Sequence, residues 1–367
     1  MTAKSSKKIL YAASTAEHLE RFHRDYIAAL RRDGFTVETL AKGEGADFNL
    51  PFEKRLLSPK NLLCTIRLGR IIRKGGFDAI IMNTSLAAFL IRLACPRKSR
   101  PRTVNVVHGY LFSEKLTARG APLLLCELAV RRKTDLILTM NEEDTRLARR
   151  FRLSVGGVIK TPGMGAELKN TITPADVLRE RFFAHNAFLI VFVGELSKRK
   201  NQSLLIKAMK NTKKHLPNAV LCLVGDGGER DRLKRLTRRL GLSDSVRFMG
   251  KRQDACDFIR AADLYVSPSR IEGMPFNVIE ALDAQRVVLA SDIKGHRDLI
   301  EDGENGFLFR SGCKRELTEK LIRIGCGDVY LKITHEKEKH SAYKKSEAFP
   351  KTLSILKRAI SENNANL

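Results

Sequence analysis

Short runs of apolar, mostly β-branched residues alternate along the chain with longer segments whose apolar residues recur at helical spacing. The first series of runs predicts strands at residues 8–12, 36–39, 79–82, 103–107 and 136–139. A second series predicts strands from Phe188 (FLIVFVG) onward and at residues 219–224, 246–249, 264–266 and 287–290. Strands that alternate with helices form parallel sheets covered on both faces, so the two series predict two doubly wound α/β domains.

The boundary between these domains is predicted in the segment TPGMGAELKNTITPAD, residues 161–176, where proline and glycine interrupt the pattern. We therefore expect a first domain at residues 1–170 and a second at residues 171–345. The polar residues after Gly327 are helical in places. Residues 346–367 are expected to form a helical tail that crosses back onto the first domain.

Composition is that of a globular protein, because 367 residues of which 43% are hydrophobic can build two apolar cores. The seven cysteines include no Cys-x-x-Cys pair, so they predict neither a zinc site nor a disulfide framework. The N-terminal MTAKSSKKILYAAS is too poor in apolar residues for a signal peptide or a membrane span, and no later segment has span length. A reducing cytoplasm fits these features best.

Net charge is the unusual property, since 67 basic residues against 41 acidic ones give +26. Such a charge attracts polyanions: nucleic acid, anionic lipid or a phosphorylated substrate. Residues 54–74 contain no acidic residue and place Arg67, Arg70 and Lys74 at helical spacing, with Leu63, Ile66 and Ile71 available for the other side. This pattern is typical of a basic amphipathic helix on an anionic membrane. An ordinary helix with a solvated basic face is the alternative.

Two loops at predicted strand ends are candidates for phosphate binding, since ligands of open α/β sheets bind beyond the carboxyl ends of the strands. After FLIVFVG, the residues Lys198, Arg199 and Lys200 precede a helix and could cradle a diphosphate; a solvated basic turn is the alternative. The next strand ends in GDGGER, which departs from the dinucleotide fingerprint because Arg230 occupies its third glycine position. We expect these glycines to permit a tight strand-to-helix turn.

The stretch SPSRIEGMPFNVIEAL places Glu272 in a loop and Glu280 about one turn inside the following helix. That arrangement argues against two carboxylates flanking a scissile bond. A metal pair is also unsupported, because the chain has no Asp-x-Asp and no histidine beside these glutamates. The pattern favours a polar ligand along the helix N-terminus, with its hydroxyls bonded by carboxylates and its phosphates by N–H groups.

Several motifs in order, VGELSKRKN, LVGDG, VRFMGKRQD, AADLYVSPS, EGMPFNVIEAL and DIKGHRDLIEDGENGFLF, resemble the retaining nucleotide-sugar glycosyltransferases of family 4. The resemblance spans residues 7–345 and is strongest in the second domain. It implies two Rossmann-like domains facing each other across a cleft, the GT-B arrangement. The details of EGMPFNVIEAL and GHRDLI look most like the branch that assembles capsules and exopolysaccharides, where UDP-hexoses and UDP-N-acetylhexosamines are common donors.

The resemblance also implies roles for individual residues. Glu280 would bond the donor ribose, Glu272 would face the donor sugar as a catalytic residue, and Lys200 and Arg199 would bind the diphosphate. In the first domain VVHGYLF would bring His108 to the reacting sugar, although a histidine after a strand is more often a packed structural residue. The remaining donor-side positions are the backbone of Gly273, Met274, Pro275 and Phe276 and the base-bordering Gly250, Lys251 and Arg252; Ser14 and Thr15 would lie on the acceptor side.

Two departures from the family pattern change this expectation. Where the family often has Gly-Arg-Leu, this chain has Gly194-Glu195-Leu196, so a diphosphate-binding cation is absent and Lys198 or Arg199 is the candidate replacement. The first strand ends in AASTAEHLERFH, without the glycines that many members have there. The acceptor-side role of Ser14 and Thr15 is therefore left open.

The resemblance implies transfer of a hexosyl group without metal or cofactor, by same-face attack of the acceptor hydroxyl. The implied partners are a nucleotide-sugar, a lipid-linked saccharide acceptor and an anionic membrane, with the protein peripheral at the inner face of the cell membrane. A GT-B-like sugar-nucleotide epimerase and a catalytically silent nucleotide-binding relative remain alternatives. No specific nucleic acid is expected, because the basic residues are dispersed, tryptophan is absent and no nucleic-acid module is recognisable.

Overall fold

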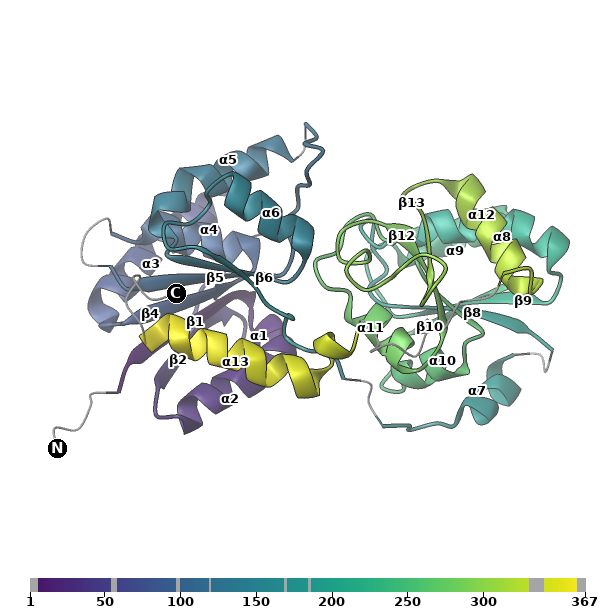
Figure 1. Cartoon of the computed structure of the whole chain (residues 1–367), viewed down its shortest axis with the longest axis horizontal. Coiled ribbons are helices and arrows are strands. Elements are labelled where there is room, and N and C mark those ends of the chain that lie inside the picture. Colours follow the sequence, from purple (N-terminus) through teal and green to yellow (C-terminus); the bar gives the residue numbers. More distant parts are fainter. Residues whose placement is uncertain are drawn as a thin grey trace. The chain divides into compact units, whose positions relative to one another are not determined.

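The computed structural model describes residues 6–53, 58–96, 100–118, 120–167, 170–183, 186–329 and 340–361, and the structural statements below concern these residues. They form two compact units (Figure 1). One unit comprises the described residues up to Met164 together with those from Ser346 onward, and the other extends from Gly165 to Lys345. The sequence had suggested a boundary after residue 170.

The first unit is built on a seven-stranded parallel sheet with the order β3-β2-β1-β4-β5-β6-β7. Its strands are β1 (Lys8–Thr15), β2 (Thr36–Lys42), β3 (Phe48–Asn49), β4 (Ala79–Asn83), β5 (Arg102–Val107), β6 (Leu136–Thr139) and β7 (Val158–Lys160). Its helices are α1 (Ala16–Phe22), α2 (Arg24–Arg32), α3 (Pro59–Gly75), α4 (Ser85–Ala94), α5 (Ala121–Val130), the short 3₁₀ helix η1 (Arg131–Lys133), α6 (Glu142–Arg150) and α13 (Lys345–Ser361).

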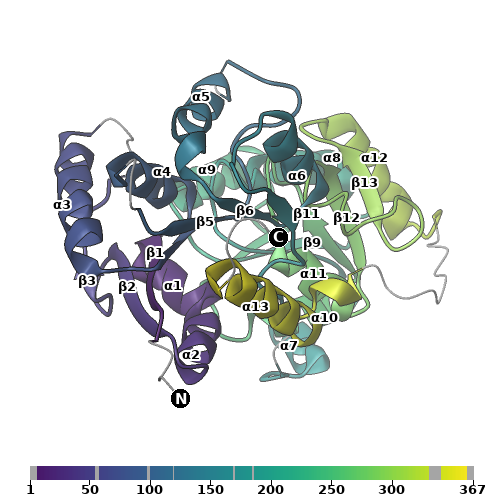
Figure 2. The ribbon, with the colours of Figure 1, turned by 60° about the vertical axis from the view of Figure 1, so that its left-hand side comes forward.

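Helix α13, drawn in yellow, lies beside α2 on the first unit (Figures 1 and 2). The ring of Phe349 is 4.6 Å from that of Tyr26, and the Thr352 hydroxyl donates to the Gly163 carbonyl at 2.7 Å. The chain thus returns to its first unit after completing the second. Residues 362–367 of the predicted tail lie outside the described ranges.

The second unit contains a six-stranded parallel sheet with the order β10-β9-β8-β11-β12-β13. Its strands are β8 (Phe188–Val193), β9 (Ala219–Val224), β10 (Val246–Gly250), β11 (Leu264–Ser267), β12 (Val287–Asp292) and β13 (Phe307–Arg310). Its helices are α7 (Ala175–Phe182), α8 (Gln202–His215), α9 (Arg230–Arg239), α10 (Ala255–Ala261), α11 (Phe276–Asp283), α12 (Lys314–Gly325) and the 3₁₀ helix η2 (Ser341–Tyr343).

The predicted α/β class is confirmed, and a strand occurs at every position where the hydrophobic pattern placed one. Among the described residues the structure adds β3, β7 and β13. The first two have two and three residues, with side chains that are half-buried or exposed, so their sequences carry little hydrophobic signal. β13 pairs only with β12, at the edge of its sheet.

Each sheet contains one point where the strand order reverses, between β1 and β4 in the first unit and between β8 and β11 in the second. The connections leave in opposite directions there, which opens a crevice beyond the carboxyl ends of the two strands. Ser14 lies at the end of β1 and Thr84 directly follows β4, whereas Lys200 and Glu272 lie in the loops after β8 and β11. The fold therefore brings Ser14 to one crevice and Lys200 and Glu272 to the other, and all three are sequence-predicted site residues.

Helix α3 departs from the predicted division into a basic and an apolar side. Its buried side is formed by Asn61, Cys64, Leu68, Gly69 and Ile72, whereas two of the three apolar residues predicted to lie opposite the cations are exposed. Leu63 is 60% and Ile66 48% exposed, and Leu62 beside them is 65% exposed. Of Leu63, Ile66 and Ile71, only Ile71 packs against the core of the described residues. Residues 54–57 of the predicted basic segment lie outside the described ranges.

The start and end of α3 follow local rules. The Ser58 hydroxyl accepts a hydrogen bond from the Lys60 N–H, Pro59 occupies the first turn, and Gly76 ends the helix with φ 61°. None of the helices in the described part of the chain is both long enough and apolar enough to cross a membrane.

Candidate functional site

Close backbone contacts bring the strand ends of the second unit together. A Cβ atom on Gly225 would lie 1.9 Å from the Gly194 carbonyl oxygen, and one on Gly227 would lie 2.4 Å from that of Leu196. Gly225 also has φ +136°, which a residue with a side chain rarely adopts. The expected role of the GDGG segment in a tight strand-to-helix turn is thus confirmed, and these glycines place the loop after β9 against the loop after β8.

The two loops at the reversal point, after β8 and after β11, are joined by a cluster of charges. Glu272 has its Oε1 2.8 Å from the Lys200 Nζ and its Oε2 2.8 Å from an Arg199 guanidinium nitrogen. The Arg270 N–H also donates to the Arg199 carbonyl at 2.9 Å. The side chain of Glu272 is 6% exposed and that of Lys200 13%, whereas Arg199 reaches further into solvent at 40%.

Glu272 remains ionised in this cluster. Burial by itself would raise the pKa of its carboxyl, but the charges of Lys200 and Arg199 outweigh burial and lower the pKa to about 2. Two cations around one carboxylate leave a net positive charge at the end of β8. This local excess suits an anionic ligand such as a diphosphate.

Glu195, the residue that departs from the family pattern, is 61% exposed and lies 4.0 Å from the Arg199 guanidinium. Lys198 is exposed as well. Of the two proposed replacements for the missing cation, Arg199 is the one that contacts the buried cluster.

A further histidine, His296, supports the loop that carries Glu272. Its Nδ1 is 2.7 Å from the Ser291 carbonyl oxygen, so Nδ1 carries the proton and Nε2 accepts from the Ser267 hydroxyl at 3.0 Å. Burial lowers the pKa of His296 to about 4, against the opposing charge of Glu272. The preceding Gly295 permits close packing on the Gly273 carbonyl, where a Cβ would approach to 2.7 Å. The GHRDLI motif was noticed in the sequence, but this supporting role was not predicted.

Helix α11 begins at the same loop, with Pro275 as its N-cap and Phe276 as its first residue. The Asn277 amide donates to the Val193 carbonyl, which fixes the first turn of α11 against the end of β8. Glu280 lies half-buried one turn further along. Burial, followed by the charge of Glu280, raises the pKa of Tyr265 on β11. The backbone of Gly273 and Met274 is buried beside Glu272.

The segment after β10 reaches the same edge of the sheet. The Gly250 carbonyl accepts a hydrogen bond from the Gly225 N–H at 2.7 Å, and Lys251 is exposed. Arg252 makes two hydrogen bonds of 2.7 Å with Asp254 and lies over the rings of Phe182 and Phe258. Its guanidinium is therefore committed to these neighbours.

In the first unit Ser14 and Thr15, the residues that the resemblance places on the acceptor side, lie at the end of β1. The Thr84 hydroxyl oxygen is 2.7 Å from that of Ser14 and also accepts from the Ser14 N–H at 3.0 Å. Thr84 has φ 84°, a strained conformation of the kind that gathers at functional sites. Thr15 caps α1, because its hydroxyl accepts from the His18 N–H at 3.3 Å. Thr84 was missed in the sequence; nothing in MNTSL indicates a positive φ.

His108 follows β5 and lines a small pocket within the first unit, together with Thr84, Asn105, Gly109 and Tyr110. Burial, assisted by the nearby His18, lowers the pKa of His108 to about 3, so the ring is neutral near pH 7. Neither His18 nor His23 was singled out in the sequence, since AEHLERFH matches no known ligand spacing. Both lie beside His108 in the fold.

The family model described as glycosyl transferases group 1 matches residues 176–328, which include all the donor-side candidates named above. A Bacillus subtilis protein named as a glycosyltransferase, EpsD, is 31% identical over 338 residues, covering 87% of each chain. An Escherichia coli protein named UDP-Gal:α-D-GlcNAc-diphosphoundecaprenol α-1,3-galactosyltransferase is 26% identical over 277 residues, covering 72% of this chain and 70% of that protein.

Among solved structures, Anabaena HepE in complex with UDP-glucose superposes with a TM-score of 0.71 at 21% identity, covering 98% of this chain and 100% of that one. The matched structures include glycosyltransferases of the GT-B fold, so the two-sheet architecture of this chain is the GT-B fold.

Proposed function

Because the chain belongs to the glycosyltransferase group 1 family and is a glycosyltransferase, we propose that it is a retaining hexosyltransferase of family 4. The proposed donor is a UDP-hexose or UDP-N-acetylhexosamine, and the acceptor is a lipid-linked saccharide in capsule or exopolysaccharide assembly. The observation that carries this proposal is the cluster of Lys200, Arg199 and Glu272 at the reversal point of the second sheet.

Donor cleavage builds negative charge on the leaving diphosphate and positive charge on the sugar. Lys200 and Arg199 supply positive charge at the end of β8, and the N-terminus of α11 adds the positive end of its helix dipole at the same loop. Glu272 keeps its negative charge and faces the sugar, where positive charge develops. This distribution accelerates transfer to the extent that it binds the transition state more tightly than the donor.

Names and bound ligands of similar proteins support the choice of substrates. The Escherichia coli relative is named for a UDP-galactose donor and a diphosphoundecaprenol-linked acceptor, and HepE was solved with UDP-glucose. Glu280, one turn inside α11, then bonds the ribose hydroxyls, and the 250–252 segment borders the uracil. In the first unit, the acceptor lies by Ser14, Thr15 and His108, with neutral His108 donating or accepting a hydrogen bond at the reacting sugar.

Donor binding is proposed to be independent of metal. Lys200 and Arg199 supply the positive charge that a Mg²⁺ ion would otherwise provide for the diphosphate, and Glu272 has both carboxylate oxygens in ion pairs with them. The proposed retention follows from attack by the acceptor hydroxyl on the face that the diphosphate leaves, the mechanism that the resemblance to family 4 implies.

A peripheral position at the inner face of the cell membrane is proposed from α3. Its exposed surface combines Leu62, Leu63 and Ile66 with basic residues, namely Lys60, Arg67, Arg70, Arg73 and Lys74. Apolar side chains that enter the headgroup region and cations that face anionic lipid are the two contributions that hold an interfacial helix. A lipid-linked acceptor would be available at that surface.

The test is calorimetric titration of the purified chain with UDP, GDP and ADP, first with chelator and then with magnesium. A preference for UDP that is unchanged by magnesium supports the proposed donor. Absence of nucleotide binding would mean that Glu195 marks a lost donor site and would reject the proposed donor site, whereas binding without turnover would point to the silent relative. Incubation of candidate UDP-sugars with and without lipid-linked acceptor separates transfer, which needs the acceptor, from epimerisation, which does not.

A further inference from the structure

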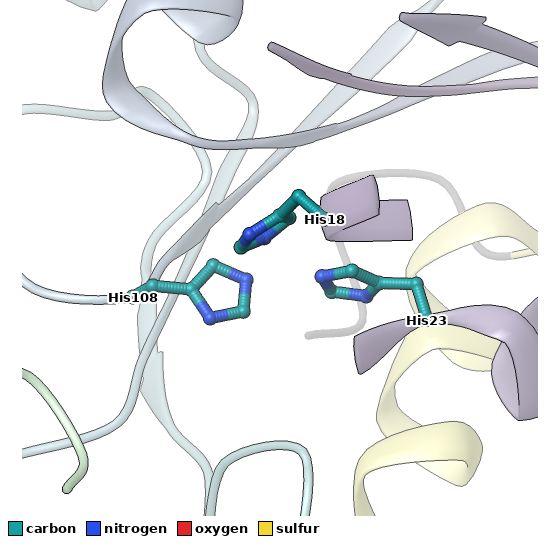
Figure 3. A group of neighbouring side chains, drawn as sticks. All are labelled: His18, His23 and His108. Carbon is teal, nitrogen blue, oxygen red and sulfur yellow. The ribbon is translucent and has the colours of Figure 1, made fainter. Parts of the chain in front are cut away.

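Three imidazole rings of the first unit point toward one another (Figure 3). The ring centroids are 5.0 Å apart for His18 and His108, 5.1 Å for His23 and His108, and 5.2 Å for His18 and His23. One ring nitrogen from each residue can be chosen so that all three atoms lie within 4.8 Å of one another. No role in the transfer reaction has been assigned above to His18 or His23.

The local fold explains why distant residues converge. On one continuous helix, positions five residues apart differ by about 140° around the axis and do not face the same side. Here α1 ends at Phe22 and α2 begins at Arg24, with His23 between them at φ −126° and ψ −4°. This break turns the His23 ring toward His18. His108 reaches the same point from the end of β5, two strands from β1.

Each of the three rings has a buried nitrogen, Nε2, that finds no hydrogen-bond partner among the described residues. A buried polar atom without a partner is costly, and three of them in one cluster indicate a missing common partner. The Nδ1 of His23 is 2.9 Å from the Tyr11 hydroxyl, which leaves its Nε2 directed away from that bond. Metal-bound histidines characteristically engage their second nitrogen in this way.

We propose that His18, His23 and His108 form a binding site for one divalent transition-metal ion of the zinc, cobalt or nickel class. Imidazole nitrogen is a ligand that these ions favour, whereas Mg²⁺ and Ca²⁺ prefer oxygen. Three protein ligands leave a fourth position for water or a substrate oxygen, as in sites that keep an exchangeable ligand. His108 is shared with the role proposed above at the reacting sugar, but metal binding at the three rings is measured without donor or acceptor.

The protonation state of the cluster agrees with this assignment. Burial lowers the pKa of His18 to about 4 and that of His108 to about 3, and it places the pKa of His23 well below its usual value. The rings are therefore neutral near pH 7 and can offer lone pairs. With metal–nitrogen bonds of about 2.0 Å in a tetrahedral site, the ligand atoms would lie about 3.3 Å apart, so the rings must approach by up to about 1.5 Å on binding.

The experiment is a Co²⁺ titration of the full chain, freed of any histidine tag and treated with chelator. Cys126, Cys313 and Cys326 are replaced by serine in the parent, because they are the thiols that are not fully buried. We expect one equivalent of Co²⁺ to produce visible absorption bands of a tetrahedral ion, which Zn²⁺ abolishes and Mg²⁺ does not. Zn²⁺ should also raise the midpoint of thermal unfolding.

Variants then locate the ion. H18A and H108A should each weaken Co²⁺ binding at least tenfold, whereas H215A, which removes an exposed histidine of the second unit, should not change it. Circular dichroism without metal verifies that each variant is folded. The proposal is overturned if the folded parent shows no saturable Co²⁺ bands, or if the bands persist in a folded H18A/H108A double variant.

Discussion

At the scale of single residues, the proposed donor site depends most directly on Glu280. If its carboxylate bonds the ribose hydroxyls, Glu280→Ala should weaken UDP binding by about 1–3 kcal/mol, the usual range for charge-assisted hydrogen bonds. Calorimetric titration of both proteins with UDP measures the difference.

A matched control removes another glutamate from a helix of the same unit. Glu319 on α12 is exposed and forms only a long ion pair of 3.7 Å with Arg315, so Glu319→Ala should bind UDP like the parent. Equal UDP affinity in the Glu280→Ala and parent proteins would reject the ribose assignment.

Glycines at the strand ends provide a second prediction at this scale. Gly225→Ala should lower the free energy of unfolding of the second unit by about 2–4 kcal/mol, because the added Cβ meets the Gly194 carbonyl and φ is +136°. UDP binding should weaken with it, since the displaced loops include Lys200. Denaturant unfolding followed by circular dichroism measures the loss.

Gly228 lies three residues further along the same loop, and a Cβ there meets nothing within 4 Å. Gly228→Ala should therefore leave stability within about 0.5 kcal/mol of the parent. Equal stability of the two alanine variants would contradict this explanation. Glycine at position 225 would then not be required by the close approach of the loops after β8 and β9.

At the scale of secondary-structure elements, α3 separates two contributions to membrane binding. Replacing Leu62, Leu63 and Ile66 by serine should weaken binding to vesicles with anionic lipid while leaving the fold intact, because all three side chains are exposed. Replacing Arg67, Arg70 and Arg73 by glutamine should also weaken binding and reduce its dependence on salt. Vesicle sedimentation at several salt concentrations measures both effects.

The control for charge is the same change on α9, whose exposed Arg235, Arg238 and Arg239 lie in the second unit. Both triple variants lose three charges, so a purely nonspecific attraction would weaken equally in each. Binding that falls only with the α3 variant supports a membrane-facing helix. Binding to neutral vesicles as strong as to anionic ones would contradict the proposal.

The sequence located an element when the element's own residues carry a hydrophobic pattern. It missed an element that forms only because a neighbouring strand or helix is present. Strands such as β4, AIIMN, are buried on both faces, so their apolar runs were sufficient to locate them. β3 and β7 are two and three residues long and exist because a neighbouring strand offers hydrogen bonds, which no local pattern records. The buried side of α3 likewise depended on which helices and strands it packs against.

The candidate site divides in the same way. Glu272 and Lys200 lie in two different motifs, and each was predicted from its own motif. Their direct ion pair follows from the adjacency of β8 and β11, which no single motif records. The histidine cluster was not predicted, because His18 and His108 are ninety residues apart and meet only through the order of the strands.

At the scale of the whole molecule, the charge of +26 exceeds what α3 and the donor loops require. Helices such as α9 also carry exposed basic residues, which belong to neither α3 nor the donor loops. The excess should attract polyanions with a strong dependence on salt and little selectivity. Vesicle and nucleotide experiments therefore need a salt series before any affinity is interpreted.

Acid should destabilise the second unit in two steps. His296 has its pKa lowered by burial to about 4, with Glu272 and Asp292 opposing the shift and Lys200 assisting it, and an unfolded histidine titrates near 6.5. Between these values the unfolded chain binds more protons, so stability is complete above pH 6.5 and falls as the pH decreases. At pH 5 the loss from this ring is about 1–2 kcal/mol. Glu272, with a pKa of about 2 when folded, adds a second loss between pH 4.5 and 2.

Hydrogen exchange read out by mass spectrometry measures this loss in peptides of the second unit, at pH values corrected for the intrinsic exchange rate. His296→Gln should remove the first step, because glutamine does not titrate, whereas His215→Gln, at an exposed position, should keep it. If the second unit of the parent is as stable at pH 5 as at pH 7.5, His296 is not held neutral beneath the Glu272 loop. The link between that buried ring and the donor loops would then have to be abandoned, although the ion pairs of Glu272 with Lys200 and Arg199 would stand.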